Sequence, residues 1–167
     1  MKKSHILSLL IALVALAIPA TASAAANPAQ WSISPAPATT YALPNASTPY
    51  TMSNATHGAL GYGKRTIGVD LSWNGKGAWE FMRANERDHR RLVGGESTAL
   101  YNTYTKQYLV YKVRPLGINL DWSNAPSRQW VVSRSPATGA LALYNTVTRQ
   151  YLGYGQRPFG INLVWLG

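Results

Sequence analysis

The stretch LVYKVRPLGINLDW at residues 109–122 recurs without gaps as LGYGKRTIGVDLSW at 60–73 and as LGYGQRPFGINLVW at 152–165. The shared pattern is L-x-Y-x-x-R-x-Φ-G-Φ-[DN]-L-x-W, where Φ is an apolar residue. The nine residues before it also repeat, as LYNTYTKQY at 100–108 and LYNTVTRQY at 143–151, and residues 51–59 hold the same place in degenerate form. A repeat of this length indicates three copies of one supersecondary unit.

Each unit has the alternation of β-strands. Ile118, Leu120 and Trp122 alternate with Asn119 and Asp121, which places the apolar side chains on one face and the polar ones on the other. All six tryptophans belong to two threefold sets, which we predict to pack mainly in the core because large aromatic side chains bury the most area; the sets are Trp31, Trp79 and Trp130, and Trp73, Trp122 and Trp165. We expect about four short strands in each unit.

The ends of the repeats suggest how the units assemble. The third unit lacks the strand that follows the repeated tryptophan in the other two, and the segment at Trp31 resembles the one at Trp130. The N-terminal strand could therefore pair beside the last unit and remove the open sheet edges. The fold class predicted from these observations is all-β: a β-trefoil with three pseudo-equivalent four-strand repeats, at about 30–73, 78–122 and 129–165, closed by the N-terminal strand.

The first 24 residues have the features of a secretory signal peptide. Lys2 and Lys3 precede an apolar stretch at 6–18, and Ala22-Ser23-Ala24 is a small-x-small cleavage site. The stretch is shorter than the roughly 20 residues that a membrane-spanning helix needs. We expect a signal peptide at 1–24, a short extension at 25–28 and the folded domain at 29–167, in a secreted or periplasmic protein with no transmembrane segment after cleavage. Cleavage would lower the formal charge from +10 to +8, because two lysines are removed.

The composition excludes several chemistries. The chain has no cysteine, so disulfides, thiolate nucleophiles and cysteine-based metal sites are absent. Six acidic residues and three histidines leave few groups for acid-base catalysis or metal binding. We therefore expect a binding protein rather than an enzyme, with no cofactor, no metal and no catalytic residues.

The repeats resemble those of the ricin-type (R-type) lectin superfamily. The resemblance rests on the order of KQYL at 106–109 or RQYL at 149–152, then G-I-N-L-x-W, then NAPSRQW at 124–130. It implies a trefoil that binds carbohydrate without catalysis. Galactose-binding members carry an Asp where this chain has Gly61, Val110 and Gly153, so the galactose specificity of the family does not carry over.

Two sets of side chains are candidate ligand-binding residues. In the first set, an arginine and an Asp or Asn five residues later could hold vicinal sugar hydroxyls; alternatively, the arginine pins its own hairpin by bonding the Asp or Asn or loop carbonyls. These pairs are Arg65 with Asp70, Arg114 with Asn119, and Arg157 with Asn162. The second set, Tyr104, Tyr108 and Tyr151, could stack on sugar rings. Unit one has Met52, Ala55 and Ala59 at the matching aromatic positions, which predicts a defective site there.

Three functions remain open from the sequence. The first is a lectin-like protein with up to three shallow sites for glycans or glycoconjugates. The second is a protein-binding trefoil, such as a proteinase inhibitor or a toxin-like receptor-binding protein, that uses loop 84–98, where the charge run 86–91 lies. The third is a binder of anionic polymers such as cell-wall glycans, whose affinity would fall steeply with salt. Nucleic acid is not an expected partner.

Overall fold

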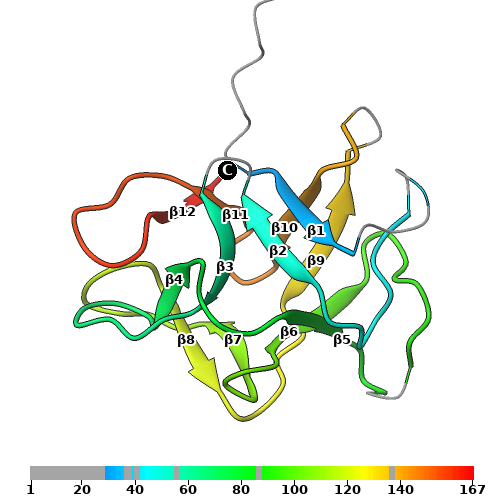
Figure 1. Ribbon diagram of the computed structural model, residues 1–167, viewed down its shortest axis with the longest axis horizontal. Coiled ribbons are helices and arrows are strands. Elements are labelled where there is room, and N and C mark those ends of the chain that lie inside the picture. The colour runs from blue at the N-terminus through cyan, green and yellow to red at the C-terminus, as the bar shows by residue number, and fades with distance from the viewer. Residues whose placement is uncertain (1–28, 36–38, 40–41, 55–56, 86–87, 136–137) are drawn as a thin grey trace, which may run out of the picture.

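The computed structural model describes residues 29–35, 39, 42–54, 57–85, 88–135 and 138–167 (Figure 1). The predicted signal peptide and the extension at 25–28 lie outside the described residues. The described chain contains twelve strands and no helix, and none of its segments is a helix that could cross a membrane. The all-β part of the predicted fold class is therefore confirmed.

Four short strands belong to each repeat, as the alternation predicts. Unit one contains β1 (Trp31–Ser34), β2 (Thr51–Asn54), β3 (Gly58–Tyr62) and β4 (Leu71–Trp73). Unit two contains β5 (Trp79–Met82), β6 (Ser97–Asn102), β7 (Gln107–Tyr111) and β8 (Leu120–Ser123). Unit three contains β9 (Trp130–Arg134), β10 (Leu141–Asn145), β11 (Gln150–Tyr154) and β12 (Leu163–Leu166).

The strands form one antiparallel sheet that curls into a half-barrel (Figure 1). Its main path runs β4-β3-β2-β1-β10-β9-β6-β7-β8, with β5 beside β6 and with β11 between β10 and β12. Strand β1 joins unit one to unit three, and β9 joins unit three to unit two. The turns β3–β4, β7–β8 and β11–β12 lie together on the left of Figure 1.

The predicted closed β-trefoil is wrong. The N-terminal strand β1 pairs with β2 and β10, whereas the last strand β12 pairs only with β11. Between units one and two the described residues form isolated bridges, not a ladder between named strands. Tyr50 and Trp79 exchange two backbone hydrogen bonds of 2.8 Å, and Asn45 forms a second bridge with Arg91. No ladder between named strands therefore closes the sheet at this seam.

The core confirms the prediction for the first tryptophan set. Trp31, Trp79 and Trp130 are at most 1% exposed, and the indole N–H of each donates to a leucine carbonyl of the neighbouring unit. These bonds join Trp31 to Leu152 at 2.8 Å, Trp79 to Leu60 at 2.6 Å and Trp130 to Leu109 at 2.8 Å.

The second tryptophan set is partly buried and packs against the core. Each member stacks on a core tryptophan, with ring centroids about 6 Å apart: Trp73 on Trp31, Trp122 on Trp79 and Trp165 on Trp130. Their buried indole N–H groups have no hydrogen-bond acceptor among the described residues. Each stack therefore lies within one unit, whereas the indole hydrogen bonds of the first set join neighbouring units.

Candidate functional site

The Asp and Asn residues of the first candidate set hold their own hairpins. In each unit the side-chain oxygen accepts a hydrogen bond from the backbone N–H of the arginine five residues earlier. The distances are 2.8 Å for Arg65 to Asp70, 3.0 Å for Arg114 to Asn119 and 3.2 Å for Arg157 to Asn162. This is the local pinning that the sequence left open as the alternative to a ligand site.

The arginine side chains of this set reach across to a neighbouring unit. Each guanidinium donates to the carbonyl of the repeated glycine in the turn of another hairpin: Arg65 to Gly160 at 3.2 Å, Arg114 to Gly68 at 3.0 Å and Arg157 to Gly117 at 2.6 Å. The contacts form a closed ring of three. These groups therefore fasten the three turns together, and their use for a ligand is not required to explain the pattern.

The three candidate tyrosines lie in different surroundings. Tyr104 is 51% exposed and stacks on Tyr62 at the start of the β3–β4 turn, with a centroid distance of 5.4 Å. Tyr108 is 7% exposed and packs against Tyr101 at 5.1 Å. Tyr151 is 39% exposed and meets Tyr144 edge to face at 5.2 Å. The tyrosine pair of β6 and β7 thus recurs on β10 and β11, and Tyr104 stands apart from both pairs.

A groove beside the first tyrosine pair, the unit-two groove, brings together residues from four segments of the chain. It has a volume of about 410 Å³ and is lined by Ser47, Glu80, Met82, His89, Tyr101, Thr103, Lys106 and Tyr108. Aromatic surface, a carboxylate and two basic side chains therefore share one shallow depression. Of these residues, Tyr108 is a ligand-binding candidate from the sequence, whereas sequence reasoning missed Ser47 and Glu80.

Two groups in the unit-two groove are held in unusual states. Burial raises the pKa of the Glu80 carboxyl, and the nearby positive charges of Lys106 and His89 oppose that rise. Ser47 is 8% exposed, has a φ of 50° and lines the groove, and its buried hydroxyl has no hydrogen-bond partner among the described residues. A buried hydroxyl without a partner is costly.

The equivalent positions in the other units lack part of this set. Ser53 pairs with Ala59 in unit one where Tyr101 pairs with Tyr108 in unit two, which agrees with the predicted loss of aromatic residues there. The sequence match of Met52 with an aromatic position is wrong by one residue, because the β2–β3 connection is one residue shorter; Met52 is in the core. Residues 55 and 56 lie outside the described residues.

In unit three the tyrosine pair is present, but the partner carboxylate is not. The residue after the core tryptophan is Val131, where unit two has Glu80. Tyr151 lines a different groove of about 350 Å³, which also contains Ala29, Gln30 and Arg134. Only unit two therefore combines a tyrosine pair with a carboxylate at these positions.

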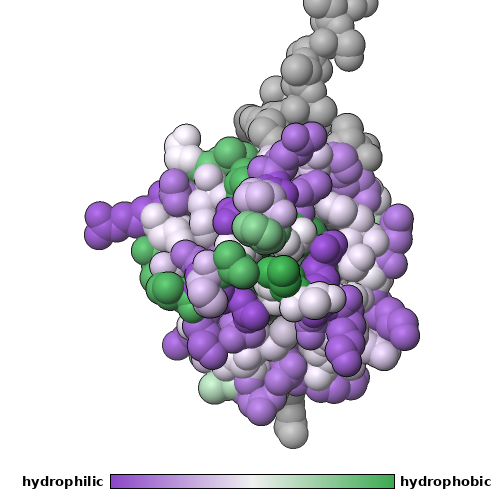
Figure 2. Space-filling model, turned by 90° about the vertical axis from the view of Figure 1, so that its left-hand side faces the viewer, coloured by the Kyte–Doolittle hydropathy of each residue, from purple (hydrophilic) through white to green (hydrophobic). Residues whose placement is uncertain are grey.

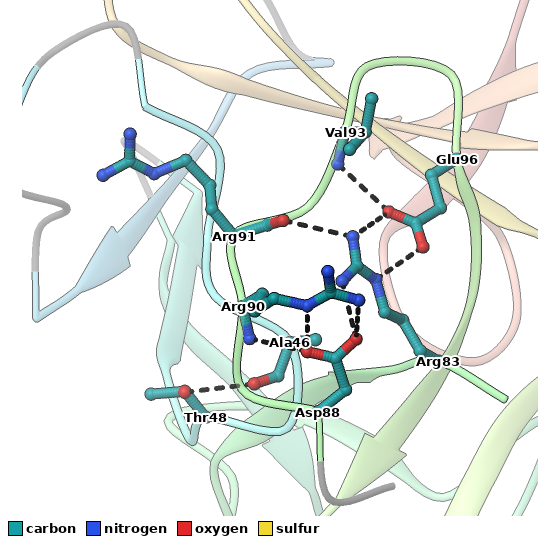
Figure 3. A network of polar contacts seen from close by, with 8 residues as sticks. All are labelled: Ala46, Thr48, Arg83, Asp88, Arg90, Arg91, Val93 and Glu96. Carbon is teal, nitrogen blue, oxygen red and sulfur yellow. Dashed lines mark hydrogen bonds and ion pairs between the residues drawn. The ribbon is translucent and has the colours of Figure 1, made fainter. Parts of the chain in front are cut away.

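Loop 84–98 is anchored by a network centred on Arg83 (Figure 3). The Arg83 guanidinium pairs with Asp88 at 2.9 Å and with Glu96 at 2.5 Å, and it donates to the carbonyl of Arg91 at 3.1 Å. Hydrogen bonds from Arg90 hold the pKa of Asp88 well below its usual range, and the bond from Arg83 lowers the pKa of Glu96. The described part of the loop is thus held from its base, and His89, Arg90 and Arg91 are exposed. Residues 86 and 87 of the charge run lie outside the described residues.

Three structural asparagines were missed by the sequence reasoning. Asn54, Asn102 and Asn145 are at most 5% exposed, and Asn102 and Asn145 each accept two backbone N–H groups of the following turn. The repeated Leu-Tyr-Asn-Thr at 100–103 and 143–146 carried this signal. In the described part of the chain, no group of three or more His, Asp or Glu residues gathers as a metal site.

Comparison with known proteins leaves the family open. No family model, no curated protein and no solved structure matches the chain. The likeness to ricin-type lectins therefore rests on the repeat residues alone, and the function must be argued from the grooves and surfaces described above.

Proposed function

We propose that the protein is a secreted, non-catalytic carbohydrate-binding protein whose principal site is the unit-two groove. The observation that carries this proposal is the joint presence of Tyr101, Tyr108, Glu80 and Ser47 in one depression of about 410 Å³. Sugars present apolar C–H faces and clusters of hydroxyls, so they are bound by a surface that offers both aromatic area and a small number of polar groups.

The polar groups divide into acceptors and donors. The Glu80 carboxylate has two oxygens that can accept from adjacent sugar hydroxyls, and Lys106 supplies N–H donors at the exposed side of the groove. The Ser47 hydroxyl can donate or accept. The groove is open and shallow, which suits a glycan bound at its end or side with modest affinity.

The units differ in their capacity for this chemistry. Unit two has the full set, unit three has the tyrosine pair with Val131 beside it, and unit one has neither tyrosine. Of the three shallow sites that the repeat permits, we propose that one is complete, one is partial and one is lost. A single strong site predicts one-to-one binding in solution.

The test is a glycan array followed by calorimetric titration of the best neutral hit, at low and high salt. We expect binding that survives high salt, and a loss of at least about tenfold in affinity for Glu80→Gln, because a charge-assisted hydrogen bond contributes about 1.5–3 kcal/mol. Tyr104→Ala is the matched control, since Tyr104 is exposed but lies outside the groove. A hit whose affinity is unchanged by Glu80→Gln, or equally reduced by the control, refutes the assignment of the site.

The pH dependence gives an independent check. Because the pKa of Glu80 is raised, the carboxylate is protonated at a higher pH than an ordinary glutamate as the solution is acidified. Affinity should therefore begin to fall above the usual glutamate range, and the Glu80→Gln variant should show a flatter profile. Binding only to acidic glycans, lost at high salt, would instead favour the anionic-polymer alternative.

One observation favours a protein-binding function as the second candidate. Val93 is 66% exposed in loop 84–98, while its N–H is bonded to Glu96 at 3.0 Å. A held loop that presents an apolar side chain is suited to contact a protein partner. An array with no carbohydrate hit, together with a binding partner that is lost on Val93→Asp, would establish this function in place of the first.

A further inference from the structure

The three repeated turns place an apolar residue at the same exposed position in every unit. Ile67, Leu116 and Phe159 are 38%, 44% and 46% exposed, and each comes directly before the repeated glycine. We call these three residues the apolar pole. The apolar residue just after the glycine is about 1% exposed in each unit. In unit two the same turn also exposes Val113, at 72%.

The glycines show that the members of the apolar pole are close together. A Cβ on Gly117 would lie 3.1 Å from the Cα of Gly68, and a Cβ on Gly160 would lie 3.4 Å from the Cα of Gly117. The backbones of the three turns therefore meet at these glycines, and the residues before them start from neighbouring positions. Figure 2, which faces the left side of Figure 1, shows hydrophobic residues gathered near the middle of this face with hydrophilic residues around them. Clustered exposed apolar residues indicate an interaction surface.

The same turns carry an excess of basic side chains. Lys64, Arg65, Lys112, Arg114 and Arg157 lie in the three turns, against Asp70 and Asp121 in or beside them. Asp121 pairs with Lys112 and Arg114, each at 3.0 Å. The end of the molecule that bears the apolar pole is therefore positively charged.

A groove joins the apolar and basic parts of this surface. It has a volume of about 540 Å³ and lies between the turns of units one and three, where Lys64, Arg65 and Ser72 face the same space as Ile67 and Phe159. A phosphate-bearing lipid headgroup would find the N–H donors of Lys64 and Arg65 there, while neighbouring lipids contact Ile67 and Phe159.

We propose that the apolar pole docks on an anionic lipid surface, with Ile67, Leu116 and Phe159 entering the headgroup region. The exposed amines of Lys64 and Lys112 would contact acidic headgroups. Apolar side chains combined with clustered Lys and Arg at one end are the features that bind proteins to such surfaces. A second copy of this chain is the less favoured occupant, since two positive ends would be brought together. In Figure 1 the three turns lie on the left and β5, which carries Glu80 of the unit-two groove, lies on the right. The apolar pole and the unit-two groove are therefore on different sides of the molecule.

The test is sedimentation of the purified protein with vesicles of phosphatidylcholine alone or with one quarter phosphatidylglycerol. We expect binding to the anionic vesicles, and a loss of about tenfold or more in the triple variant Ile67→Ser, Leu116→Ser, Phe159→Ser, because binding scales with the apolar area inserted. The matched control is Val93→Ser with Val147→Ser, which removes two side chains that are 66% and 56% exposed elsewhere.

A second variant separates charge from apolar contact. Lys64→Gln keeps the apolar pole and should weaken binding to anionic vesicles about fivefold, from roughly 1 kcal/mol per basic residue near the surface. The thermal midpoints of all variants are measured alongside, since loss of fold would also remove binding. The proposal is overturned if the protein does not bind anionic vesicles, or if it binds both lipid mixtures equally. It is also overturned if the folded triple variant binds like the control, or if the protein binds an acidic protein but no vesicle.

Discussion

The stacked pair Trp79 and Trp122 allows the contribution of an inter-unit hydrogen bond to be measured. The rings are nearly parallel, with an interplanar angle of 9°, but only the Trp79 N–H has an acceptor, the carbonyl of Leu60 at 2.6 Å. Replacing Trp79 by Phe leaves that buried carbonyl without this donor, which costs about 1–3 kcal/mol. The smaller ring adds about 1–2 kcal/mol through the cavity it leaves. We expect Trp79→Phe to lower the free energy of unfolding by about 3 kcal/mol.

The matched change at Trp122 should cost far less. Its buried N–H has no acceptor among the described residues, so replacement by Phe removes a desolvated polar group, a gain that offsets the lost packing. Thermal unfolding followed by circular dichroism measures both, and a difference of about 3 kcal/mol corresponds to roughly 6–12 °C in Tm. Equal losses for the two variants, or a larger loss for Trp122→Phe, would refute the reasoning that the hydrogen bond to the neighbouring unit decides the difference.

Three further substitutions test contacts that stabilise the fold. Gly117→Ala should lower the free energy of unfolding by at least about 1–2 kcal/mol, because its φ is +82°, whereas Gly94→Ala, with no atom near its Cβ, should be near neutral in the same denaturant titration. Since the pKa of Asp88 is lowered by hydrogen bonds from Arg90, its stabilising effect is complete above the ordinary carboxyl range near pH 4 and is lost below it; Tm measured from pH 6 to pH 2 should fall less for Asp88→Asn. Asn145→Ala should cost about 2–4 kcal/mol by calorimetry, because it leaves two backbone N–H groups of the following turn without their acceptor.

The local structure was readable from the repeat because it depends on near neighbours. The alternation of Ile118, Leu120 and Trp122 predicted a strand, which the structure begins at Leu120, two residues later than the pattern. The position of Trp130 predicted a core residue, and the bond from the N–H of Arg114 to Asn119 was one of two uses foreseen for that pair. Each of these depends on contacts within a few residues or on a face set by a period of two.

The contacts between distant segments of the chain could not be predicted from the sequence. The predicted closure of the sheet is wrong because the seam between units one and two has isolated bridges in place of a ladder. The bond from Arg65 to Gly160 spans 95 residues. Ser47, Glu80 and Tyr108 line the same unit-two groove, and no motif or spacing in the sequence predicts that they do. The repeat directed attention to residues present in all three units, whereas this groove is distinguished by residues that unit two does not share with the others.

The indole hydrogen bonds run in one direction around the molecule: unit two to unit one, unit three to unit two, and unit one to unit three. No unit supplies the acceptor for its own core tryptophan. A single repeat cut from this chain would therefore be an incomplete monomer that could bury its tryptophan only by assembling with two copies of itself. Because each unit completes its neighbour in this way, we expect the three units to unfold together rather than one at a time.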